Sequence, residues 1–259
     1  TGDLIKVKGI IQIYNQRKQL VVHKIENVTA SFNKADFILE TEDVDVGALY
    51  IQLLDFVAKI KSSYIQQICL DTLNEPEIKE KLKVSAAAKT VHHAHKGGLL
   101  KHIVSICKMM DFISSQYPSL NKDFLLFGAL FHDIGKLWEL DTNSAQQTYY
   151  TEAGQLLGHM QLACELVDRK SSRIMGFPDE LRILLKHIIL SHHGKIEYGS
   201  PKLPMFAEAM IVAMVDDLDS KIDQVLSFIN QEKQSGEKWS KYNEHFQRYF
   251  LLEDFKEKW

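Results

Sequence analysis

The sequence predicts a mainly α-helical protein that begins with a β-hairpin, and three observations favour this fold class. Apolar residues recur at three- and four-residue steps from Val46 to beyond Phe228, in segments as long as ordinary helices. Residues 4–14 instead alternate apolar and polar side chains, which is typical of a strand. The 259 residues include 45% hydrophobic and 25% charged side chains, as expected for one large globular domain or one domain plus a small one.

The hairpin is the first expected element. A polar turn at 15–18 joins the strand at 4–14 to a partner strand at 20–25. Because two strands alone are only marginally stable in water, the hairpin must lean on other structure or belong to a larger β-domain. Its lysines and Tyr14 would suit a platform for single-stranded nucleic acid, but they would equally suit the solvated edge of a sheet.

Helices are expected throughout the rest of the chain, after an acidic, turn-like linker at 40–45. Pro76 breaks the first helical pattern, and Gly97 and Gly98 free the backbone before a later helix. Residues 138–150 are polar and are expected to form a loop. The expected helices run from 46 to the break at 74–76, over 76–82, 99–115, 122–131, 152–169 and 179–190, and from 205 past 228.

Composition excludes little about partners. The formal net charge of −3 gives no global basic field for nucleic acid, although a local basic groove can exist on a near-neutral protein. Cys69, Cys107 and Cys164 lie far apart in apolar helical segments without a CxxC motif, so buried reduced thiols and a cytoplasmic location are expected. No apolar run approaches about 20 residues and no signal-peptide pattern is present, so neither a membrane span nor export is expected.

His132 and Asp133 form the most informative pair in the chain. The apolar helix at 122–131 delivers an imidazole and a carboxylate to its own C-terminal end, and both are suitable ligands for Mn²⁺, Fe²⁺, Mg²⁺ or Zn²⁺. Gly135 would permit the helix to stop, and Lys136 places a cation beside the metal. A His-Asp pair alone is common, but nine of the eleven histidines lie between residues 92 and 193, in separate clusters.

Seven candidate ligands follow from this distribution, each on a helix or just past its end. Successive clusters are about 20–35 residues apart, which is one helix plus a connection, so a bundle could bring them to one centre. Each alone has an ordinary explanation, such as a helix cap or an exposed acidic face. Together they exceed the needs of one tetrahedral site and suit two metals bridged by a carboxylate, which favours metal-dependent phosphodiester hydrolysis. The candidates are His102, His132, Asp133, His159, His192, His193 and Asp216.

The order of these residues, H…HD…D, resembles the HD-domain metal-dependent phosphohydrolases, an all-helical superfamily, and the additional histidines resemble its binuclear branch. Four blocks more closely resemble the YhaM-type 3′→5′ exoribonucleases of Gram-positive bacteria. They are 93–102 (HAHKGGLLKH), 131–136 (FHDIGK), 191–201 (SHHGKIEYGSP) and 216–221 (DDLDSK). The resemblance runs from about residue 1 to 228.

The resemblance implies removal of nucleotides from the 3′ end of single-stranded RNA, with single-stranded DNA as a second possible substrate and no membrane partner. It implies two divalent ions, with Mn²⁺ first and Fe²⁺, Co²⁺ or Mg²⁺ as alternatives. We assign one metal to His102, His132, Asp133 and Asp216, and the second to Asp133, His159, His192 and His193. Asp216 is preferred to Asp217 only because it aligns with the family, since helical phase admits either.

The resemblance also implies residues that contact the substrate. Lys136 is expected to bind the scissile phosphate and stabilise its developing charge, next to the catalytic Asp133. Glycine-rich surroundings suit a phosphate backbone that passes close to main-chain amides. The further expected substrate contacts are His93, His95, Glu197, Tyr198 and Ser200.

Three regions are expected on this basis. Members of the family carry an OB-fold nucleic-acid-binding domain before the HD domain, and the hairpin resembles only its later strands. We therefore expect a partial OB-fold region at 1–40, a linker with helices at 41–84 and an HD phosphohydrolase domain at 85–259. A homo-oligomer is a further expectation, with the aromatic C-terminal tail as one place for subunit contacts.

Two other functions remain open at this point. One is an HD-type nucleotide or cyclic-dinucleotide phosphodiesterase, since HD domains hydrolyse many phosphoesters. The other is a nucleic-acid-binding factor whose HD domain is only structural, which missing metal ligands would favour. An open basic channel from the hairpin to the metals would favour the exonuclease, and a closed pocket would favour the small-nucleotide hydrolase.

Overall fold

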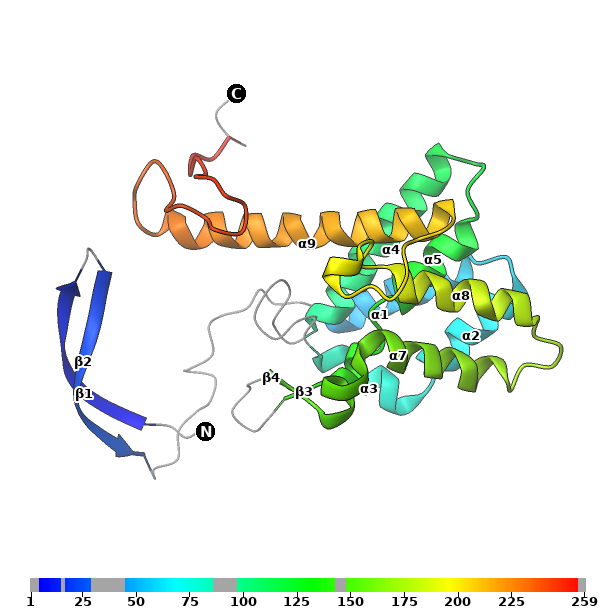
Figure 1. Ribbon diagram of the computed structural model, residues 1–259, viewed down its shortest axis with the longest axis horizontal. Coiled ribbons are helices and arrows are strands. Elements are labelled where there is room, and N and C mark those ends of the chain that lie inside the picture. The colour runs from blue at the N-terminus through cyan, green and yellow to red at the C-terminus, as the bar shows by residue number, and fades with distance from the viewer. Residues whose placement is uncertain (1–4, 15–16, 29–44, 86–96, 143–147, 256–259) are drawn as a thin grey trace.

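A computed structural model describes residues 5–14, 17–28, 45–85, 97–142 and 148–255. The mainly α fold with a leading hairpin is confirmed (Figure 1). The elements are β1 (Ile5–Tyr14), β2 (Arg17–Asn27), α1 (Val46–Ala58), α2 (Ser63–Leu73), α3 (Pro76–Val84), α4 (Gly98–Gln116), α5 (Lys122–Phe131), α6 (Lys136–Glu139), β3 (Leu140–Thr142), β4 (Thr148–Tyr150), α7 (Glu152–Ser171), α8 (Asp179–Ser191), the 3₁₀ turn η2 (Ile196–Tyr198) and α9 (Ala207–Lys233).

The helices pack around α4 and α5, both of which bury many of their side chains. Helix α4 contacts α1, α5 and α9, while α5 also contacts α8, and α7 closes the bundle against α2 and α8. Figure 1 shows α9 crossing this bundle and continuing beyond it. On α5, Phe127 and Phe131 are fully buried and their rings stack with centroids 4.4 Å apart. Because the C-terminal turn of α5 lies in this core, His132 and Asp133 are delivered to the middle of the bundle.

The hairpin β1–β2 is antiparallel, as expected, and it lies apart from the bundle (Figure 1). Its register shifts between Lys8 and Gly9, where the carbonyl of Val21 lies 2.2 Å from the position that a Cβ on Gly9 would take. Every side chain of β1 is exposed, so neither face of this strand is buried. Of the expected linker, residues 40–44 lie outside the described residues, and Asp45 caps α1.

The expectation of one helix from 46 to the break at 74–76 is wrong, because α1 ends at Ala58 and α2 begins at Ser63. The carboxylate of Asp123 accepts hydrogen bonds from the backbone N–H groups of Lys61 (2.9 Å) and Ser62 (2.8 Å). These donors come from the segment between the helices, so a distant residue on α5 stabilises an interruption that the apolar spacing does not predict.

Residues 138–150 also differ from the expected loop. After the short helix α6, strand β3 pairs antiparallel with β4. The Thr151 hydroxyl donates to the Trp138 carbonyl (2.7 Å) and accepts from Gly154 N–H (2.9 Å). Thr151 thereby caps α7 and fixes its first turn against α6.

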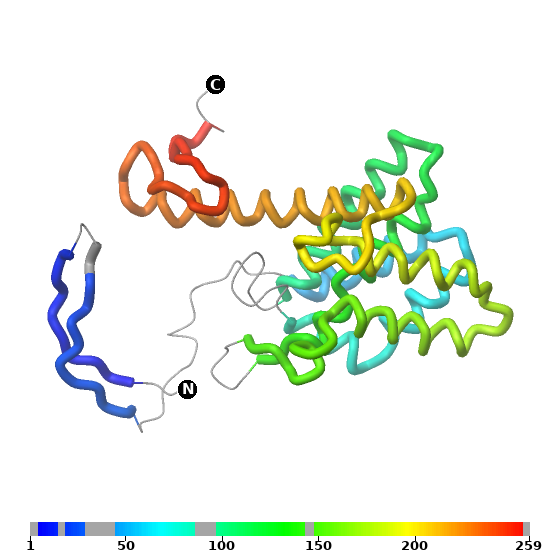
Figure 2. The backbone as a smooth tube through the Cα atoms, in the orientation of Figure 1, coloured from blue at the N-terminus to red at the C-terminus, as the bar shows by residue number. Residues whose placement is uncertain are grey.

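The C-terminal segment folds back over the outer end of α9 (Figure 2). Isolated bridges join Trp239 to Leu251 and Asn243 to Arg248, and Phe250 packs against Phe228 of α9 with ring centroids 5.9 Å apart. The segment therefore adds a small aromatic cluster that is separate from the core of the bundle.

The three cysteines are free and buried, as expected. Burial raises the pKa of the Cys164 thiol to about 12 and also raises the pKa values of Cys69 and Cys107. These thiols therefore stay protonated and unreactive. None of the helices in the described part of the chain is long and apolar enough to cross a lipid bilayer.

We expect Asp123→Ala to lower the free energy of unfolding by about 1–3 kcal/mol, because two backbone donors lose a charged acceptor. Urea denaturation followed by circular dichroism measures the change. Asp55→Ala, at an exposed position on α1, is the matched control and is expected to change stability by less than about 0.5 kcal/mol. Equal stability of the two variants would contradict the role given to Asp123.

Candidate metal centre

The seven predicted ligands come together at one place in the bundle, from five helices. His102 lies on α4, and His132 and Asp133 lie at the end of α5. His159 lies on α7, the pair 192–193 follows α8, and Asp216 lies on α9. Segments more than a hundred residues apart in the sequence thus meet at one centre, as the spacing predicts.

His102, His132 and Asp216 form one group. Their ligand atoms all lie within 4.8 Å of one another. The Nε2 atom of His102 is 3.2 Å from Nε2 of His132 and 3.2 Å from Oδ1 of Asp216. Both histidines are fully buried, so this group lies at the inner side of the centre.

His159, His192 and His193 form a second group whose ligand atoms also lie within 4.8 Å of one another. Nε2 of His159 is 3.5 Å from Nε2 of His192. His192 is fully buried, whereas His193 is only partly buried and lies toward the surface.

Asp133 stands between the two groups, with one carboxylate oxygen facing each. Its Oδ2 atom is 3.6 Å from Nε2 of both His102 and His132. Its Oδ1 atom is 3.6 Å from Nε2 of His159 and 3.7 Å from Nε2 of His192. Oδ1 is buried and accepts no hydrogen bond from the described residues. A buried carboxylate oxygen without a partner is costly, so its position calls for a cation.

All five imidazoles present Nε2 to the centre because their Nδ1 atoms are engaged elsewhere. Each Nδ1 faces an oxygen that can only accept, which identifies Nδ1 as the protonated nitrogen. Carboxylates accept the hydrogen bond from Nδ1 of His102 (Asp219, 2.7 Å) and of His159 (Glu139, 3.0 Å). Backbone carbonyls accept it from Nδ1 of His132 (Gly128 and Ala129, both 3.0 Å), His192 (Ile189, 2.7 Å) and His193 (Tyr198, 2.7 Å). This is the arrangement by which proteins orient metal-ligating histidines.

Electrostatics of the histidines agree with this arrangement. Burial lowers the pKa of His132 to about 4, and burial together with the neighbouring imidazoles lowers the pKa of His193 to about 4, so both are neutral near pH 7. For His102 burial also favours the neutral form, but hydrogen bonds to Asp216 and Asp219 outweigh it and raise the pKa to about 9. The carboxylates thus favour positive charge beside His102, whether a proton or a metal ion supplies it.

The acidic groups are held ionised. Burial opposes ionisation of Asp133, but Lys136 and then His132 keep its pKa well below the usual range. Nζ of Lys136 donates to Oδ2 of Asp133 at 2.6 Å, and this contact raises the pKa of Lys136 despite its burial. At Asp216 the hydrogen bond with His102 outweighs burial and lowers the pKa.

Two glycines let α7 approach this centre. Gly135 has an ordinary right-handed helical backbone, so the expectation that it ends the helix through special flexibility is not what the structure shows. A Cβ at Gly135 would lie 2.0 Å from the His159 carbonyl oxygen, so glycine is needed for close approach. Gly158 has φ +74° and ψ 161°, a conformation open to glycine alone, and the resulting kink turns His159 toward Glu139.

The residues predicted to contact the substrate, unlike the predicted ligands, do not all lie at the centre. Tyr198 is exposed and borders the metal centre, and Glu197 is exposed beside it on η2. The Ser200 hydroxyl is buried and donates to the carbonyls of Leu190 (3.0 Å) and Lys202 (2.9 Å), which ties down the loop after η2. His93 and His95 lie outside the described residues.

The sequence alone did not decide between Asp216 and Asp217, and only the family resemblance favoured Asp216. It also did not predict that the carboxylates of Glu139 and Asp219 support the histidines. Asp216 points inward, whereas Asp217 is exposed and pairs with Lys221 at 2.5 Å. Glu139 accepts from both the backbone N–H and Nδ1 of His159, each at 3.0 Å. Asp219 supports His102 and also accepts from Ser105 (2.5 Å). Asp219 follows Asp216 by three residues, about one helical turn, and this spacing was the sequence signal that placed both on one face of the helix.

The residues fit divalent metal. Nitrogen and oxygen ligands bind first-row divalent ions at about 2.0–2.2 Å, so neighbouring ligand atoms are expected about 3.0–3.5 Å apart. The shorter separations here, 3.2 Å within the first group and 3.5 Å within the second, lie in that range. The set of imidazoles and carboxylates suits Mn²⁺, Fe²⁺ or Zn²⁺ rather than Ca²⁺.

Comparison with known proteins places these residues in a wider context. Residues 77–221 match the HD domain family. The chain is 32% identical over 252 residues to "3′-5′ exoribonuclease YhaM" of Bacillus subtilis, covering 97% of this chain and 76% of that protein. It is 34% identical over 223 residues to the protein of the same name from Bacillus licheniformis, covering 86% and 69%. The Listeria welshimeri protein is 32% identical over 233 residues, covering 89% and 72%. No solved structure matches the chain significantly.

We expect Glu139→Ala to weaken metal binding about 10- to 100-fold, because His159 loses the acceptor that fixes its ring and its backbone N–H. Isothermal titration of the metal-free protein with Mn²⁺ measures the affinity. Glu165→Ala, which removes an exposed carboxylate from the same helix α7, is the control and should bind Mn²⁺ as the wild type does. Unchanged affinity in Glu139→Ala would show that His159 needs no such support.

Proposed function

This chain belongs to the HD-domain family and, within it, to the YhaM-type 3′-5′ exoribonucleases, and from that membership we propose that it removes nucleotides hydrolytically from the 3′ end of single-stranded RNA. HD domains are metal-dependent, so the proposed reaction requires a divalent cation. Single-stranded DNA is proposed as a second substrate, and Mn²⁺ as the preferred ion ahead of Fe²⁺, Co²⁺ and Mg²⁺.

The observation that carries the proposal is the position of Asp133 between two groups of imidazoles, with one oxygen toward each. We propose that His102, His132 and Asp216 hold one cation with Asp133, and that His159, His192 and His193 hold a second with the same carboxylate. Two such cations together activate a water molecule and stabilise the leaving oxygen of a phosphodiester.

The side chains around the centre have distinct parts in this reaction. Glu139 and Asp219 hold the imidazoles of His159 and His102 in place before substrate arrives. Lys136 donates to Asp133 in the free protein and lies beside the position where the scissile phosphate would bind. We propose that its ammonium group turns toward that phosphate and stabilises the charge that develops on it. His93, His95, Glu197, Tyr198 and Ser200 remain proposed contacts along the substrate.

The partition of the chain is proposed on the same basis. The HD match begins at residue 77 and ends at 221, so the family region includes most of α3 and much of α9. We propose that the hairpin within 1–40 is a partial OB-fold region that guides RNA toward the HD domain, with 41–84 as linker and helices and 85–259 as the catalytic part. Assembly into a homo-oligomer is part of the same proposal.

The decisive experiment is incubation with single-stranded RNA labelled at the 5′ end, in the presence of Mn²⁺. Stepwise shortening from the 3′ end is expected with the wild type and is expected to stop on chelation by EDTA. Asp133→Ala should lose activity by at least about 100-fold, since it removes the shared ligand, while Asp55→Ala on the exposed face of α1 should retain it. The same RNA labelled at its 3′ end should release mononucleotide first.

Other products would identify the alternatives. Intact RNA with turnover of a nucleotide or cyclic dinucleotide would establish the small-molecule phosphodiesterase. Binding of RNA without hydrolysis of any phosphoester would establish a binding factor with a structural HD domain. Either result would overturn the exoribonuclease proposal.

We expect Lys136→Ala to reduce kcat by about 10²–10³-fold, because a charged donor to the phosphate is lost. Mn²⁺ affinity should not fall, since the variant also removes a cation that competes for Asp133. Single-turnover RNA degradation and Mn²⁺ titration separate the two effects. Lys108→Ala, at an exposed position on α4, is the control. A parallel loss of metal affinity and activity would instead make Lys136 a structural residue.

A further inference from the structure

A pocket opens beside the metal centre, between α9 and the segment after α8. It has a volume of about 210 Å³ and lies next to the cleft that contains Asp133 and Lys136. The two hollows share four lining residues, so they form one continuous depression. Those shared residues are His193, Tyr198, Ala213 and Asp217. A molecule bound at the metal centre can therefore extend directly into this pocket.

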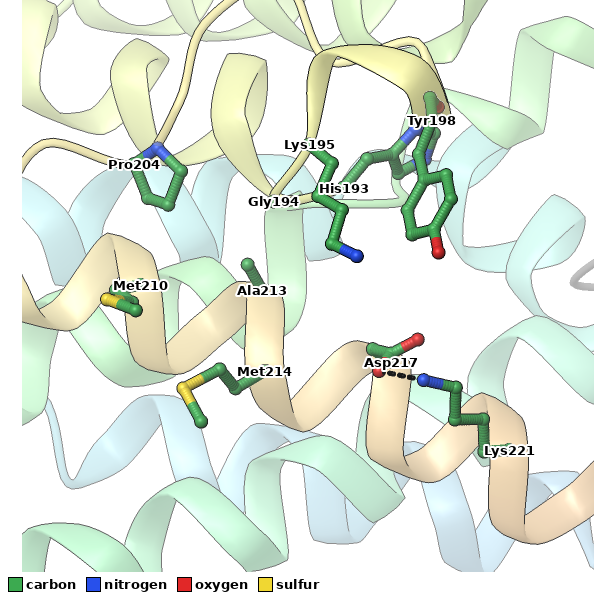
Figure 3. A pocket seen from close by; sticks show the side chains of 10 residues that line it. All are labelled: His193, Gly194, Lys195, Tyr198, Pro204, Met210, Ala213, Met214, Asp217 and Lys221. Atoms are coloured by element: carbon green, nitrogen blue, oxygen red, sulfur yellow. Dashed lines mark hydrogen bonds and ion pairs between the residues drawn. The ribbon is translucent and has the colours of Figure 1, made fainter.

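Part of the pocket lining is apolar. Tyr198 contributes its ring from η2, and Met210, Ala213 and Met214 contribute side chains from α9 (Figure 3). Tyr198 is 56% exposed, and Met210 and Met214 are 54% and 61% exposed, so none of these three is used to build the core. Exposed apolar side chains that gather beside a catalytic cleft are typical of a ligand site.

The rim of the pocket is polar and carries both charges. The Lys195 ammonium lies 5.0 Å from the centroid of the Tyr198 ring and points into the gap, as Figure 3 shows. On the opposite side, Asp217 pairs with Lys221 at 2.5 Å. The rim therefore offers both hydrogen-bond donors and an acceptor around an apolar slot.

The backbone of Tyr198 is fixed relative to His193, one of the predicted metal ligands. The carbonyl oxygen of Tyr198 accepts the hydrogen bond from His193 Nδ1 at 2.7 Å, so one residue orients a predicted ligand and carries the aromatic wall. Gly199 follows with φ +86°, which closes the turn, and its N–H donates to the Ile196 carbonyl at 2.9 Å. The aromatic wall is thus held in place by the same short segment that holds His193.

We propose that this pocket, which Tyr198 and the methionines of α9 line, binds the nucleobase of a nucleotide that flanks the scissile phosphate, by stacking on Tyr198. The inference rests on the proposed function and adds a subsite to it. A base has apolar faces and polar edges, which match the apolar lining of the pocket and the donors and acceptor at its rim. Stacking accepts any base, because every base has a π-face. Methionine adapts to rings of different size, so the subsite would not select a sequence.

The test compares RNA oligonucleotides that are identical except for an abasic ribose at the terminal or at the penultimate position. Wild-type kcat/KM should fall about 5- to 150-fold when the base is missing from one of these two positions. Tyr198→Ala should lose a similar factor on intact RNA and should lose nothing further on that abasic substrate. Tyr198→Phe keeps the ring and should therefore show the same ratio of kcat/KM between intact and abasic RNA as the wild type.

Controls separate stacking from damage to the fold and from failure of the proposed function. Phe112→Ala removes an exposed aromatic from α4 and should change neither rate. Binding of intact RNA in EDTA, measured by fluorescence anisotropy, should be weaker in Tyr198→Ala than in the wild type and should be unchanged in Phe112→Ala. Equal losses in Tyr198→Ala on intact and abasic RNA, or equal wild-type rates on all substrates, would overturn the subsite and leave the exoribonuclease standing. No degradation of intact RNA by the wild type would instead overturn the proposed function.

Discussion

The buried carboxylate of Asp133 is the constraint on which the rest of the bundle depends. It is only 2% exposed and lies among imidazoles, where an isolated negative charge would be costly. Lys136 compensates one oxygen at 2.6 Å, but Oδ1 keeps no hydrogen-bond partner among the described residues. The position of Oδ1 therefore calls for a cation, and the helices that form the apolar core also bring the imidazoles around this carboxylate.

That arrangement places the C-terminal ends of α5 and α8 at the centre. His132 and His192 are each the residue that caps a helix, so their imidazoles face the centre while α5 and α8 pack through their apolar faces. Backbone carbonyls in the last turns of these helices accept from their Nδ1 atoms. The same residues thus satisfy orphan carbonyls of the helix and leave Nε2 toward the centre. The last turns of α5 and α8 therefore end these helices and also orient the imidazoles of His132 and His192.

The sequence predicted which histidines and aspartates lie together, because their spacing follows a local rule, and it did not predict the side chains that support them, because that support is tertiary. His132 and His159 end or begin helical patterns at spacings of one helix plus a connection, which a single chain reveals. Glu139 and Asp219 act on histidines 20 and 117 residues away, and no periodicity reports that distance. The break between α1 and α2 was missed for the same reason, since Asp123 stabilises it from 61 and 62 residues away.

The exposed side of the centre is where specificity can arise. His102, His132 and His192 are fully buried, whereas His193 and Asp216 are partly open and adjoin the pocket bordered by Tyr198. Among the described residues, none closes this depression over, so the rest of a longer strand has a way out. Under the proposed function, the end of a strand would enter with one phosphate at the centre and its base against Tyr198, while the remaining strand would leave over the surface. The open side of the centre therefore suits the strand substrate that we propose.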